Sequence, residues 1–239
     1  MKCAVLVPVA HTIEPETDDA LRVLANKGYA VRVLRGSSQV DLARSTLASN
    51  AIRDGFDATM WVDSDILFNP DDVDRIITLN LPFVAGLYPC KGPRRFAGKL
   101  KDVNKEFIFG PGGSVIEAEY VGMGFTFIHK SVYDKLSEVL PVCTGGYDGK
   151  TVIPFFIPTL AQPTDGPPCY LSEDYSFCLR ATLSGFPPKI DTRIRLGHTG
   201  KKTYRWADMT PETIVASMRV VMQDTGEIVL KDWDGTWRS

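Results

Sequence analysis

The sequence predicts an α/β fold with a central, mostly parallel, twisted sheet flanked by helices and a smaller antiparallel portion in the C-terminal half. Three observations lead to this class. In the first 90 residues, continuous apolar runs alternate with segments of helical spacing, as expected for parallel strands buried on both faces. After residue 91 the chain becomes richer in glycine and proline. The length of 239 residues fits one domain with a sizeable core.

The first half predicts four strands and three helices in alternation. The strands are the apolar runs at residues 3–9, 29–34, 58–62 and 83–87. The helices are expected at residues 16–26, 40–53 and 71–79. Gly28 and Gly55 end the first two helices, and Pro70 begins the third. Because ligands bind beyond the carboxyl ends of parallel strands, we expect functional residues at that edge.

The second half predicts a less regular arrangement in the same domain. Residues 91–105 are basic and loop-like, and residues 143–168 form a long loop around one short strand at 152–157. Further strands are expected at residues 118–128 and 190–196. Helices are expected at residues 130–140, 172–183 and 211–223, the second capped by Ser172 and the third by Thr210.

Composition and charge exclude several classes of protein. The net charge of −2 gives no global attraction to nucleic acid or anionic lipid. The five cysteines are odd in number and include no Cys-x-x-Cys pair, so neither a zinc site nor a disulfide framework is expected. No apolar run approaches the roughly 20 residues that span a bilayer, and the N-terminus does not read as a signal peptide. We expect a soluble, cytoplasmic protein.

The most informative stretch is Asp63-Ser64-Asp65, directly after the apolar run at 58–62. Two carboxylates one residue apart, where a strand opens into a loop, can point at a shared hard cation, and that cation can in turn hold a diphosphate. The alternative is a pair of solvated acids in a turn. Against it, Asp71 and Asp72 already supply acids to the first turn of the next helix.

Three further motifs follow along the chain. Gly122-Met123-Gly124 interrupts an apolar strand, where glycine marks a bulge or the close approach of a ligand. Glu173-Asp174 opens a predicted helix, and His198 lies in a late glycine-flanked segment. In their order and spacing, the four motifs resemble those of the GT-A class of nucleotide-sugar glycosyltransferases and are similar to family 2 of these enzymes.

The resemblance implies a single GT-A, Rossmann-like domain over residues 1–239. It divides this domain into a nucleotide-binding half (1–90), a donor-sugar and acceptor half (91–206), and a C-terminal helix and tail (207–239). The implied activity is metal-dependent transfer of a hexosyl or pentosyl group from a nucleotide-diphosphate sugar to a hydroxyl acceptor.

The implied metal is Mn²⁺ or Mg²⁺, which neutralises the departing nucleoside diphosphate. By resemblance, Asp65 binds the metal directly, and His198 is a further ligand, which Mn²⁺ tolerates. Asp63 contacts the ribose or reaches the metal through water. For His198, a partly exposed surface histidine is the alternative that stays open.

The acidic motif supplies the implied catalytic base. An inverting transferase needs one carboxylate to deprotonate the attacking hydroxyl. The resemblance gives this role to Asp174 and leaves Glu173 to position it or to contact the acceptor. The alternative is that both acids only favour the helix dipole. Retaining enzymes share the metal motif, so inversion is the favoured but not the required outcome.

The rest of the donor site is also implied by the resemblance. Pro8 and Val9 lie where the nucleotide base sits, and Arg44 belongs to an Asp-x-x-Arg stretch on the nucleotide side. Gly122 and Gly124 line the donor sugar. Lys202 and Arg205 are expected on a flap that closes over the diphosphate, unless this segment is a solvated basic loop.

The acceptor side is less defined. Tyr88, Lys91, Arg94 and Arg95 follow the fourth strand and are candidates for it, although most basic runs of this kind are solvated loops. The acceptor hydroxyl belongs to a glycan, a lipid, a protein or a modified DNA base, and the sequence does not distinguish among these.

Three other classes were weighed against this interpretation. A phosphohydrolase of the haloacid-dehalogenase type also uses Asp-x-Asp after an apolar strand, but usually after the first strand rather than the third. A non-catalytic carbohydrate-binding module needs neither Glu173-Asp174 nor His198. A sugar-nucleotide pyrophosphorylase would need a glycine-rich loop after the first strand, and residues 9–14 contain no glycine.

Overall fold

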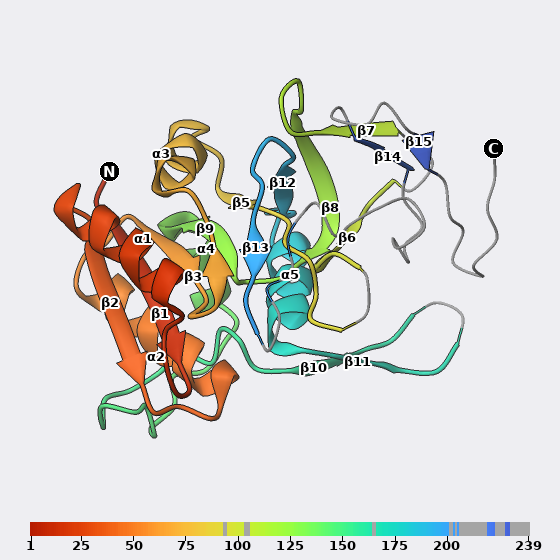
Figure 1. Ribbon diagram of the computed structural model, residues 1–239. Helices are drawn as coiled ribbons and strands as arrows, with labels where there is room; N and C mark the ends of the chain where they lie inside the picture. Colours follow the sequence, from red (N-terminus) through yellow and green to blue (C-terminus); the bar gives the residue numbers. More distant parts are fainter. Residues whose placement is uncertain are drawn as a thin grey trace.

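A computed structural model of the protein describes residues 1–92, 95–102, 106–163, 166–200, 203, 205, 219–222 and 228–229. Its first half has the predicted order of elements, with one short extra strand, β4 (Figure 1). These elements are β1 (Cys3–Val9), α1 (Pro15–Asn26), β2 (Ala30–Arg35), α2 (Val40–Arg53), β3 (Ala58–Val62), β4 (Ile66–Leu67), α3 (Pro70–Thr78) and β5 (Phe83–Ala85).

The second half is built from shorter strands and two helices among the described residues. They are β6 (Gly98–Leu100), β7 (Glu106–Phe109), β8 (Val115–Val121), β9 (Phe125–His129), α4 (Lys130–Ser137), β10 (Thr159–Ala161), β11 (Cys169–Leu171), α5 (Glu173–Leu183), β12 (Lys189–Asp191), β13 (Gly197–His198), β14 (Arg219–Met222) and β15 (Ile228–Val229).

The main sheet has eight strands in the order β2-β1-β3-β9-β5-β12-β8-β6. The pairs β1–β2, β1–β3 and β5–β12 are parallel. Strand β9 is antiparallel to β3 and β5, and β8 is antiparallel to β12 and β6. Six of the eight strands therefore run in one direction, and the two reversed strands both come from the second half. The predicted α/β class, with its antiparallel portion, is confirmed.

Several predicted elements of the second half are wrong in detail. The expected strand at 118–128 is two strands, β8 and β9, because Gly122 and Gly124 lie in the turn between them rather than inside one strand. The expected strand at 152–157 is reduced to one bridge, between Val152 and Cys143. The expected strand at 190–196 divides into β12 and, after a turn, β13.

The predicted C-terminal helix at 211–223 is contradicted where it can be compared. Residues 219–222 form β14, which pairs parallel to β7 and antiparallel to β15. Residues 211–218 and the predicted cap Thr210 lie outside the described residues. The apolar pattern of this segment therefore serves a small three-stranded sheet beside the main one (Figure 1).

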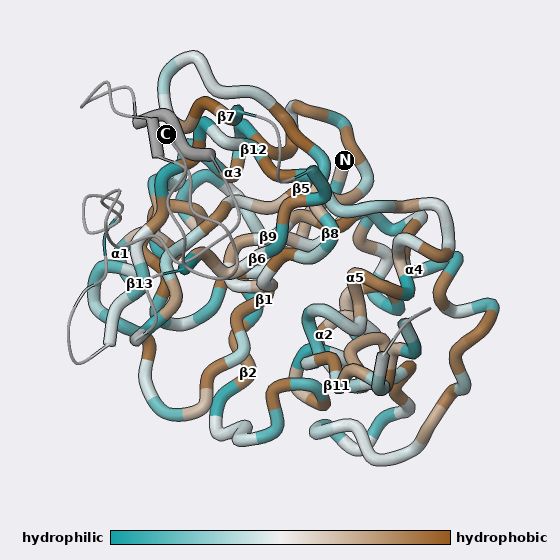
Figure 2. The backbone as a smooth tube through the Cα atoms, turned by 90° about the vertical axis from the view of Figure 1, so that its right-hand side faces the viewer, coloured by the Kyte–Doolittle hydropathy of each residue, from teal (hydrophilic) through white to brown (hydrophobic). Residues whose placement is uncertain are grey.

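Helices cover both faces of the sheet because its central strands are apolar on both faces. On one face, Leu6 and Trp61 pack with side chains of α2, α4 and α5. On the other, Val5 and Met60 pack with side chains of α1 and α3. Figure 2 shows the hydrophobic colouring concentrated along β1, β5 and β9. Among the described residues, no helix has the length and apolar character needed to cross a bilayer.

A paired polar network lies in the core beside β3. Tyr133 of α4 is fully buried, and its hydroxyl lies 2.8 Å from Thr59 Oγ1 and accepts a hydrogen bond from Trp61 Nε1 at 2.9 Å. Trp61 and Thr59 belong to β3, so this network joins α4 to the strand that ends at Asp63. Buried, satisfied networks of this kind hold neighbouring elements in one arrangement.

Candidate active site

The segment Asp63-Ser64-Asp65 joins β3 to β4 at the carboxyl end of β3. Backbone hydrogen bonds hold it in place. Asp63 N–H donates to the Gly124 carbonyl at 2.9 Å, and Glu14 N–H donates to the Ser64 carbonyl at 2.8 Å. Because every residue of β3 is buried, the segment leaves the core at a defined point. The two carboxylates then enter different surroundings.

Asp63 belongs to a cluster with Arg44 of α2 and Glu173 of α5, which we call the inner cluster. Arg44 Nη2 donates to both carboxylate oxygens of Asp63, at 2.8 and 3.0 Å. Arg44 Nε lies 3.7 Å from Glu173 Oε1. The guanidinium also lies over the ring of Trp61, 5.6 Å from its centroid. Arg44 is only 3 % exposed, so it joins the two acids from within the protein.

Burial dominates the electrostatics of the inner cluster. It raises the pKa of Asp63, and Arg44 opposes this rise. Burial also raises the pKa of Glu173, and the neighbouring charge of Asp174 adds to that rise. Burial lowers the pKa of Arg44, but the surrounding carboxylates, Asp63 first, raise it overall and keep the guanidinium charged. Of the described atoms, none accepts a hydrogen bond from Arg44 Nε or Nη1.

Asp65 belongs to a second cluster with His198 and Lys91, which we call the outer cluster. His198 Nε2 lies 3.4 Å from Asp65 Oδ1, and Lys91 Nζ lies 2.5 Å from Asp65 Oδ2. Pairing of β13 with β4 and a bond from Thr199 N–H to the Asp65 carbonyl (2.8 Å) bring these residues together. Burial opposes ionisation of Asp65, but His198 and Lys91 outweigh it and lower its pKa.

The second ring nitrogen of His198 fixes how the imidazole can act. Nδ1 lies 2.9 Å from the carbonyl oxygen of Pro89, which only accepts hydrogen bonds, so Nδ1 carries the proton. Nε2 is then the ring nitrogen that donates to Asp65 in the protonated ring and that offers its lone pair to a cation in the neutral ring. A histidine that donates its other N–H to a backbone carbonyl is the arrangement usual for metal-ligating histidines. The pair Asp65 and His198 therefore fits a divalent cation.

This pair is smaller than the predicted metal site. Among the described residues, no three His, Cys, Asp or Glu side chains converge on one point. Asp63 is held by Arg44 in the inner cluster, so the structure brings together two of the three predicted ligands. Mg²⁺ and ions like it are commonly bound by one or two protein side chains, with waters and substrate phosphates completing the coordination, so two protein ligands can hold such an ion.

The two glycines predicted to line a donor sugar contact a tyrosine. A Cβ added to Gly122 would lie 2.3 Å from Tyr88 Oη, and one added to Gly124 would lie 2.8 Å from Tyr88 Cζ. Gly124 N–H also donates to Tyr88 Oη at 3.1 Å. The close approach that the sequence indicated is therefore made by Tyr88, a buried residue whose ring also meets that of His198 edge-on at 5.3 Å.

The predicted acid and base residues begin α5. Asp174 Oδ1 accepts hydrogen bonds from the Ser172 hydroxyl and from Tyr175 N–H, the latter at 2.8 Å. Ser172 stands at the predicted cap position, but its hydroxyl makes no capping bond to the helix backbone. Asp174 is half-buried and influences the pKa of Asp63 and Tyr88, so it faces the same region as the inner cluster.

The remaining predicted site residues are divided. Pro8 and Val9 are buried, and the Val9 carbonyl accepts from Gly36 N–H at 2.9 Å, so contact with a ligand would fall to the exposed residues 10–12. Arg205 is exposed and lines a cavity of about 370 Å³ together with Asn69 and Arg195. Lys202 lies outside the described residues.

Sequence reasoning missed the partners that hold the two aspartates. Lys91 and Tyr88 were assigned to an acceptor side, and the Pro89 carbonyl was not considered. These residues follow β5, which lies in the same sheet and runs in the same direction as β3. Because the residues after β3 and β5 leave the sheet at the same edge, the sequence could have indicated that they lie close together.

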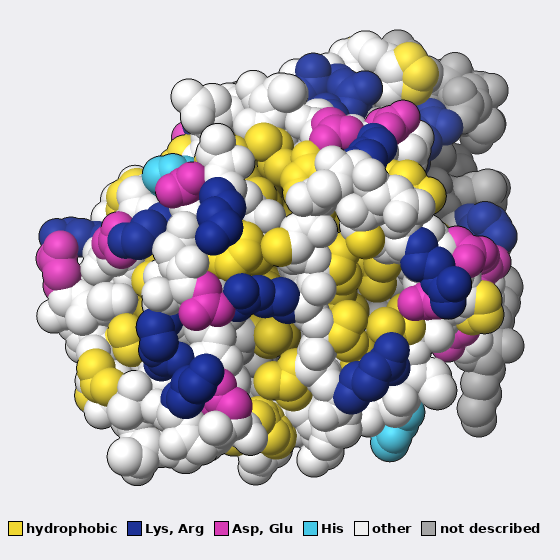
Figure 3. All heavy atoms as spheres, turned by 90° about the vertical axis from the view of Figure 1, so that its left-hand side faces the viewer, with side chains coloured by type: hydrophobic (Ala, Val, Ile, Leu, Met, Phe, Trp, Pro, Cys, Tyr) yellow, Lys and Arg dark blue, Asp and Glu magenta, His cyan; other side chains and the backbone are white. Residues whose placement is uncertain are grey.

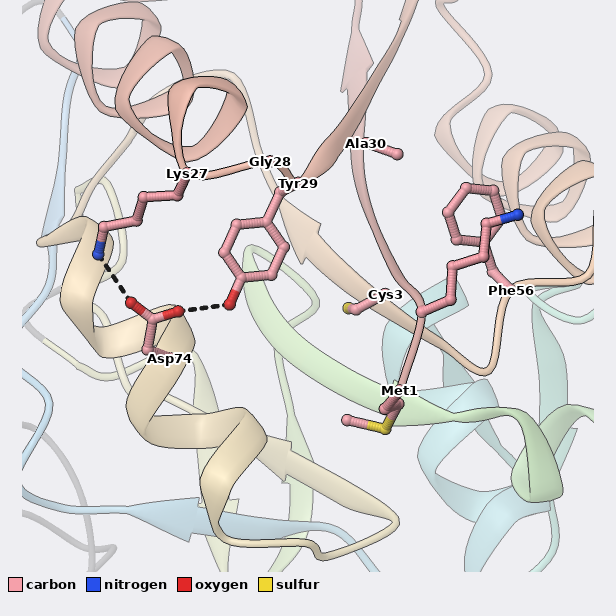
Figure 4. A pocket seen from close by; sticks show the side chains of 9 residues that line it. Met1, Cys3, Lys27, Gly28, Tyr29, Ala30, Phe56 and Asp74 are labelled. Carbon is pink, nitrogen blue, oxygen red and sulfur yellow. Dashed lines mark hydrogen bonds and ion pairs between the residues drawn. The ribbon is translucent and has the colours of Figure 1, made fainter.

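A separate cavity of about 310 Å³ lies at the amino ends of β1 and β2, away from these clusters (Figure 4). Asp74 accepts there from Lys27 at 2.7 Å and from the Tyr29 hydroxyl. On the face that carries α1 and β2, acidic and basic side chains are interspersed (Figure 3). Asp74, Lys27 and Tyr29 thus satisfy one another, and the two clusters lie at the opposite, carboxyl end of the strands.

Comparison with known proteins bears on the fold. No family model and no curated protein matches the sequence. The crystal structure of A197 from STIV is similar with a TM-score of 0.54 and 15% identity, over 97% of this chain and 95% of that one. A likeness over nearly the whole of both chains supports a common fold.

Two weaker likenesses are to transferases. A glycosyltransferase involved in glycosylation of the major capsid of PBCV-1 has a TM-score of 0.32 and 17% identity, over 55% of this chain and 62% of that one. GalNAc-T7, solved with UDP, GalNAc and Mn²⁺, has a TM-score of 0.43 and 11% identity, over 91% of this chain and 46% of that one. Neither score is high enough to bear on function.

Proposed function

We propose that this protein is a glycosyltransferase that moves a sugar from a nucleotide-diphosphate donor to a hydroxyl acceptor. The observation that carries the proposal is the meeting of Asp65 with His198, two residues far apart in the sequence, at 3.4 Å. The Pro89 carbonyl orients the imidazole so that Nε2 can bind a cation. Few structural roles require an oriented histidine lone pair beside a carboxylate.

Asp65 and His198 would hold Mn²⁺ or Mg²⁺, which supplies charge neutralisation for the departing diphosphate. Arg44 contributes from the other side of the Asp-x-Asp segment. It fixes Asp63 through two hydrogen bonds, and its Nε lies 3.7 Å from Glu173 Oε1. Because the guanidinium is buried, Arg44 would act by holding these acids beside the donor site rather than by touching the diphosphate.

Asp174 is our choice for the base that takes the proton of the acceptor hydroxyl. Glu173 faces Arg44 and is held by that charge, whereas Asp174 lies at the first turn of α5 with one oxygen fixed by Ser172 and Tyr175. Such an anchored carboxylate presents its other oxygen in a constant direction. If the acceptor hydroxyl activated by Asp174 attacks the anomeric carbon from the side opposite the diphosphate, the configuration at that carbon is inverted.

The competing phosphohydrolase mechanism needs the first aspartate as a free nucleophile. Here Arg44 donates to both oxygens of Asp63 from a buried position. A carboxylate held in this way is a poor nucleophile, because its lone pairs are already engaged by a full positive charge. The geometry therefore favours transfer of a sugar over hydrolysis of a phosphoester.

A thermal-shift screen of nucleoside diphosphates and sugar nucleotides, each with and without Mn²⁺, tests the proposal. We expect one nucleotide to raise the melting temperature only when Mn²⁺ is present. The Asp65→Ala variant should lose this increase, whereas Asp134→Ala, which removes an exposed acid of α4, should keep it. A metal-dependent increase that persists in Asp65→Ala would remove Asp65 from the metal site. No increase with any nucleotide would contradict the proposed function.

A further inference from the structure

Lys91 provides the closest cation in either cluster. Its Nζ lies 2.5 Å from Asp65 Oδ2, and the two side chains are 38 % and 27 % exposed. The backbone beside Lys91 is anchored, because Pro89 pairs with Phe96 and Ala97 N–H donates to the Tyr88 carbonyl at 2.9 Å. The backbone of Lys91 is therefore held in place, while its long side chain can either reach Asp65 or turn towards solvent.

Both oxygens of Asp65 are thus engaged, one by an imidazole and the other by an ammonium. A divalent cation bound to Asp65 and His198 would come within a few ångströms of Lys91 Nζ. At that distance two positive charges repel strongly in a partly buried site. The metal and the ammonium therefore compete for the negative charge of this carboxylate.

We propose that Lys91 is the resident counter-cation of Asp65, with which a divalent metal must compete, so that Lys91 weakens metal binding at this site. This inference rests on the proposed function, since it takes Asp65 and His198 as metal ligands. Exchange is feasible for Lys91 because its side chain is partly exposed. It is not feasible for Arg44, whose side chain is 4 % exposed.

Binding of Mn²⁺ alone to the full chain tests this role, followed through the free Mn²⁺ signal in electron paramagnetic resonance. We expect Lys91→Met to bind Mn²⁺ roughly tenfold more tightly than the wild type, because one competing positive charge is gone. Lys99→Met is the matched control, since Lys99 pairs with Glu119 at 2.6 Å on β6 and β8 and should leave the affinity unchanged. Circular dichroism checks folding, with Lys91→Gln as a second variant.

The Asp65→Asn exchange separates the two possible failures. If the wild type binds Mn²⁺ through Asp65 but Lys91→Met and Lys91→Gln bind it no more tightly, the role of Lys91 is wrong and the proposed function stands. If no variant binds Mn²⁺, the metal site and the role of Lys91 both fail. If Lys91→Met binds Mn²⁺ more weakly, Lys91 supports the metal rather than competing with it, which also overturns the inference.

Discussion

The inner and outer clusters place the same type of charge pair in opposite physical situations. In the inner cluster, Arg44 is almost fully buried and joins Asp63 to Glu173. In the outer cluster, Lys91 is partly exposed and pairs with Asp65 beside an imidazole. The two aspartates are one residue apart and equally exposed, at 26 % and 27 %. The clusters therefore differ in the exposure of their cations, at 4 % for Arg44 and 38 % for Lys91.

A buried arginine and a partly exposed lysine differ in how easily they can leave their carboxylates. If the arginine moved away, its carboxylates would remain unpaired in a buried place, which is costly. The arginine therefore fixes the position of these carboxylates. The lysine exchanges solvent and partner easily, so it leaves its carboxylate available. The pKa directions differ as well, since burial raises that of Asp63 in spite of Arg44, whereas His198 and Lys91 lower that of Asp65 against the effect of burial. One side of the motif is therefore held by a buried cation, and the other carries a cation that can exchange.

The two acids at the start of α5 can be separated by mutation into a residue of the inner cluster, Glu173, and the proposed base, Asp174. Glu173 contacts Arg44, whereas Asp174 is fixed by Ser172 and Tyr175. If Asp174 is the base, Asp174→Asn should lower the transfer rate by about 10²- to 10⁴-fold. Rates of sugar release from the donor identified by the screen, with and without acceptor, measure this. Glu173→Gln is the control and should reduce the rate less while weakening the fold. The reverse order of effects would make Glu173 the base.

Removal of Arg44 tests whether the inner cluster is structural. Arg44→Met leaves Asp63 and Glu173 without their cation in a buried place, so the free energy of unfolding should fall by about 3–5 kcal/mol. Urea unfolding followed by circular dichroism measures it. Arg22→Met, which breaks an exposed pair with Asp18, should change it by about 0.5 kcal/mol or less. A loss below about 1 kcal/mol for Arg44→Met would mean that the inner pair is as exchangeable as the outer one.

The sequence predicted the first half of the fold well because its signals are local. Continuous apolar runs and helical spacing report burial directly, and the predicted strands and helices are found up to residue 85 with small shifts at their ends. The second half depends on contacts that no local pattern contains. Strand β9 inserts between β3 and β5, and the segment at 219–222 joins β7 as a strand.

The candidate site followed the same division. Conspicuous acids and the late histidine could be selected from their positions in the sequence, and Asp65 with His198 do meet. Arg44 and Lys91 were selected as well, but not as the partners of Asp63 and Asp65, because these pairings depend on distances in the folded chain. The Pro89 carbonyl was missed. A backbone carbonyl has no signature in a sequence at all. Tyr88 packs against Gly122 and Gly124, a contact that the sequence did not reveal, and their role towards a donor sugar stays a prediction.

Asp72 of α3 tests whether close cations are what keep partly buried acids ionised. Its side chain is 17 % exposed, but its cation, Arg75, is 3.6 Å away and itself 46 % exposed. Burial raises the pKa of Asp72 to about 6, more than Arg75 lowers it, and the charge of Asp191 adds to the rise. This acid is as buried as those of the two clusters but has a looser pair.

The folded protein therefore holds a proton on Asp72 at a pH where the unfolded chain has lost it. This contribution to stability is complete below about pH 4 and is lost as the pH rises through about 6. Relative to Asp72→Asn, the wild type should lose up to about 3 kcal/mol of unfolding free energy between pH 4 and pH 7, measured by urea unfolding at each pH. Asp74→Asn gives the opposite slope, because hydrogen bonds from Lys27 and then Tyr29 lower the pKa of Asp74, so the wild type loses that stability on acidification. Equal slopes for the two variants would show that the distance to the cation does not separate these acids, and the contrast between the inner and outer clusters would lose its physical basis.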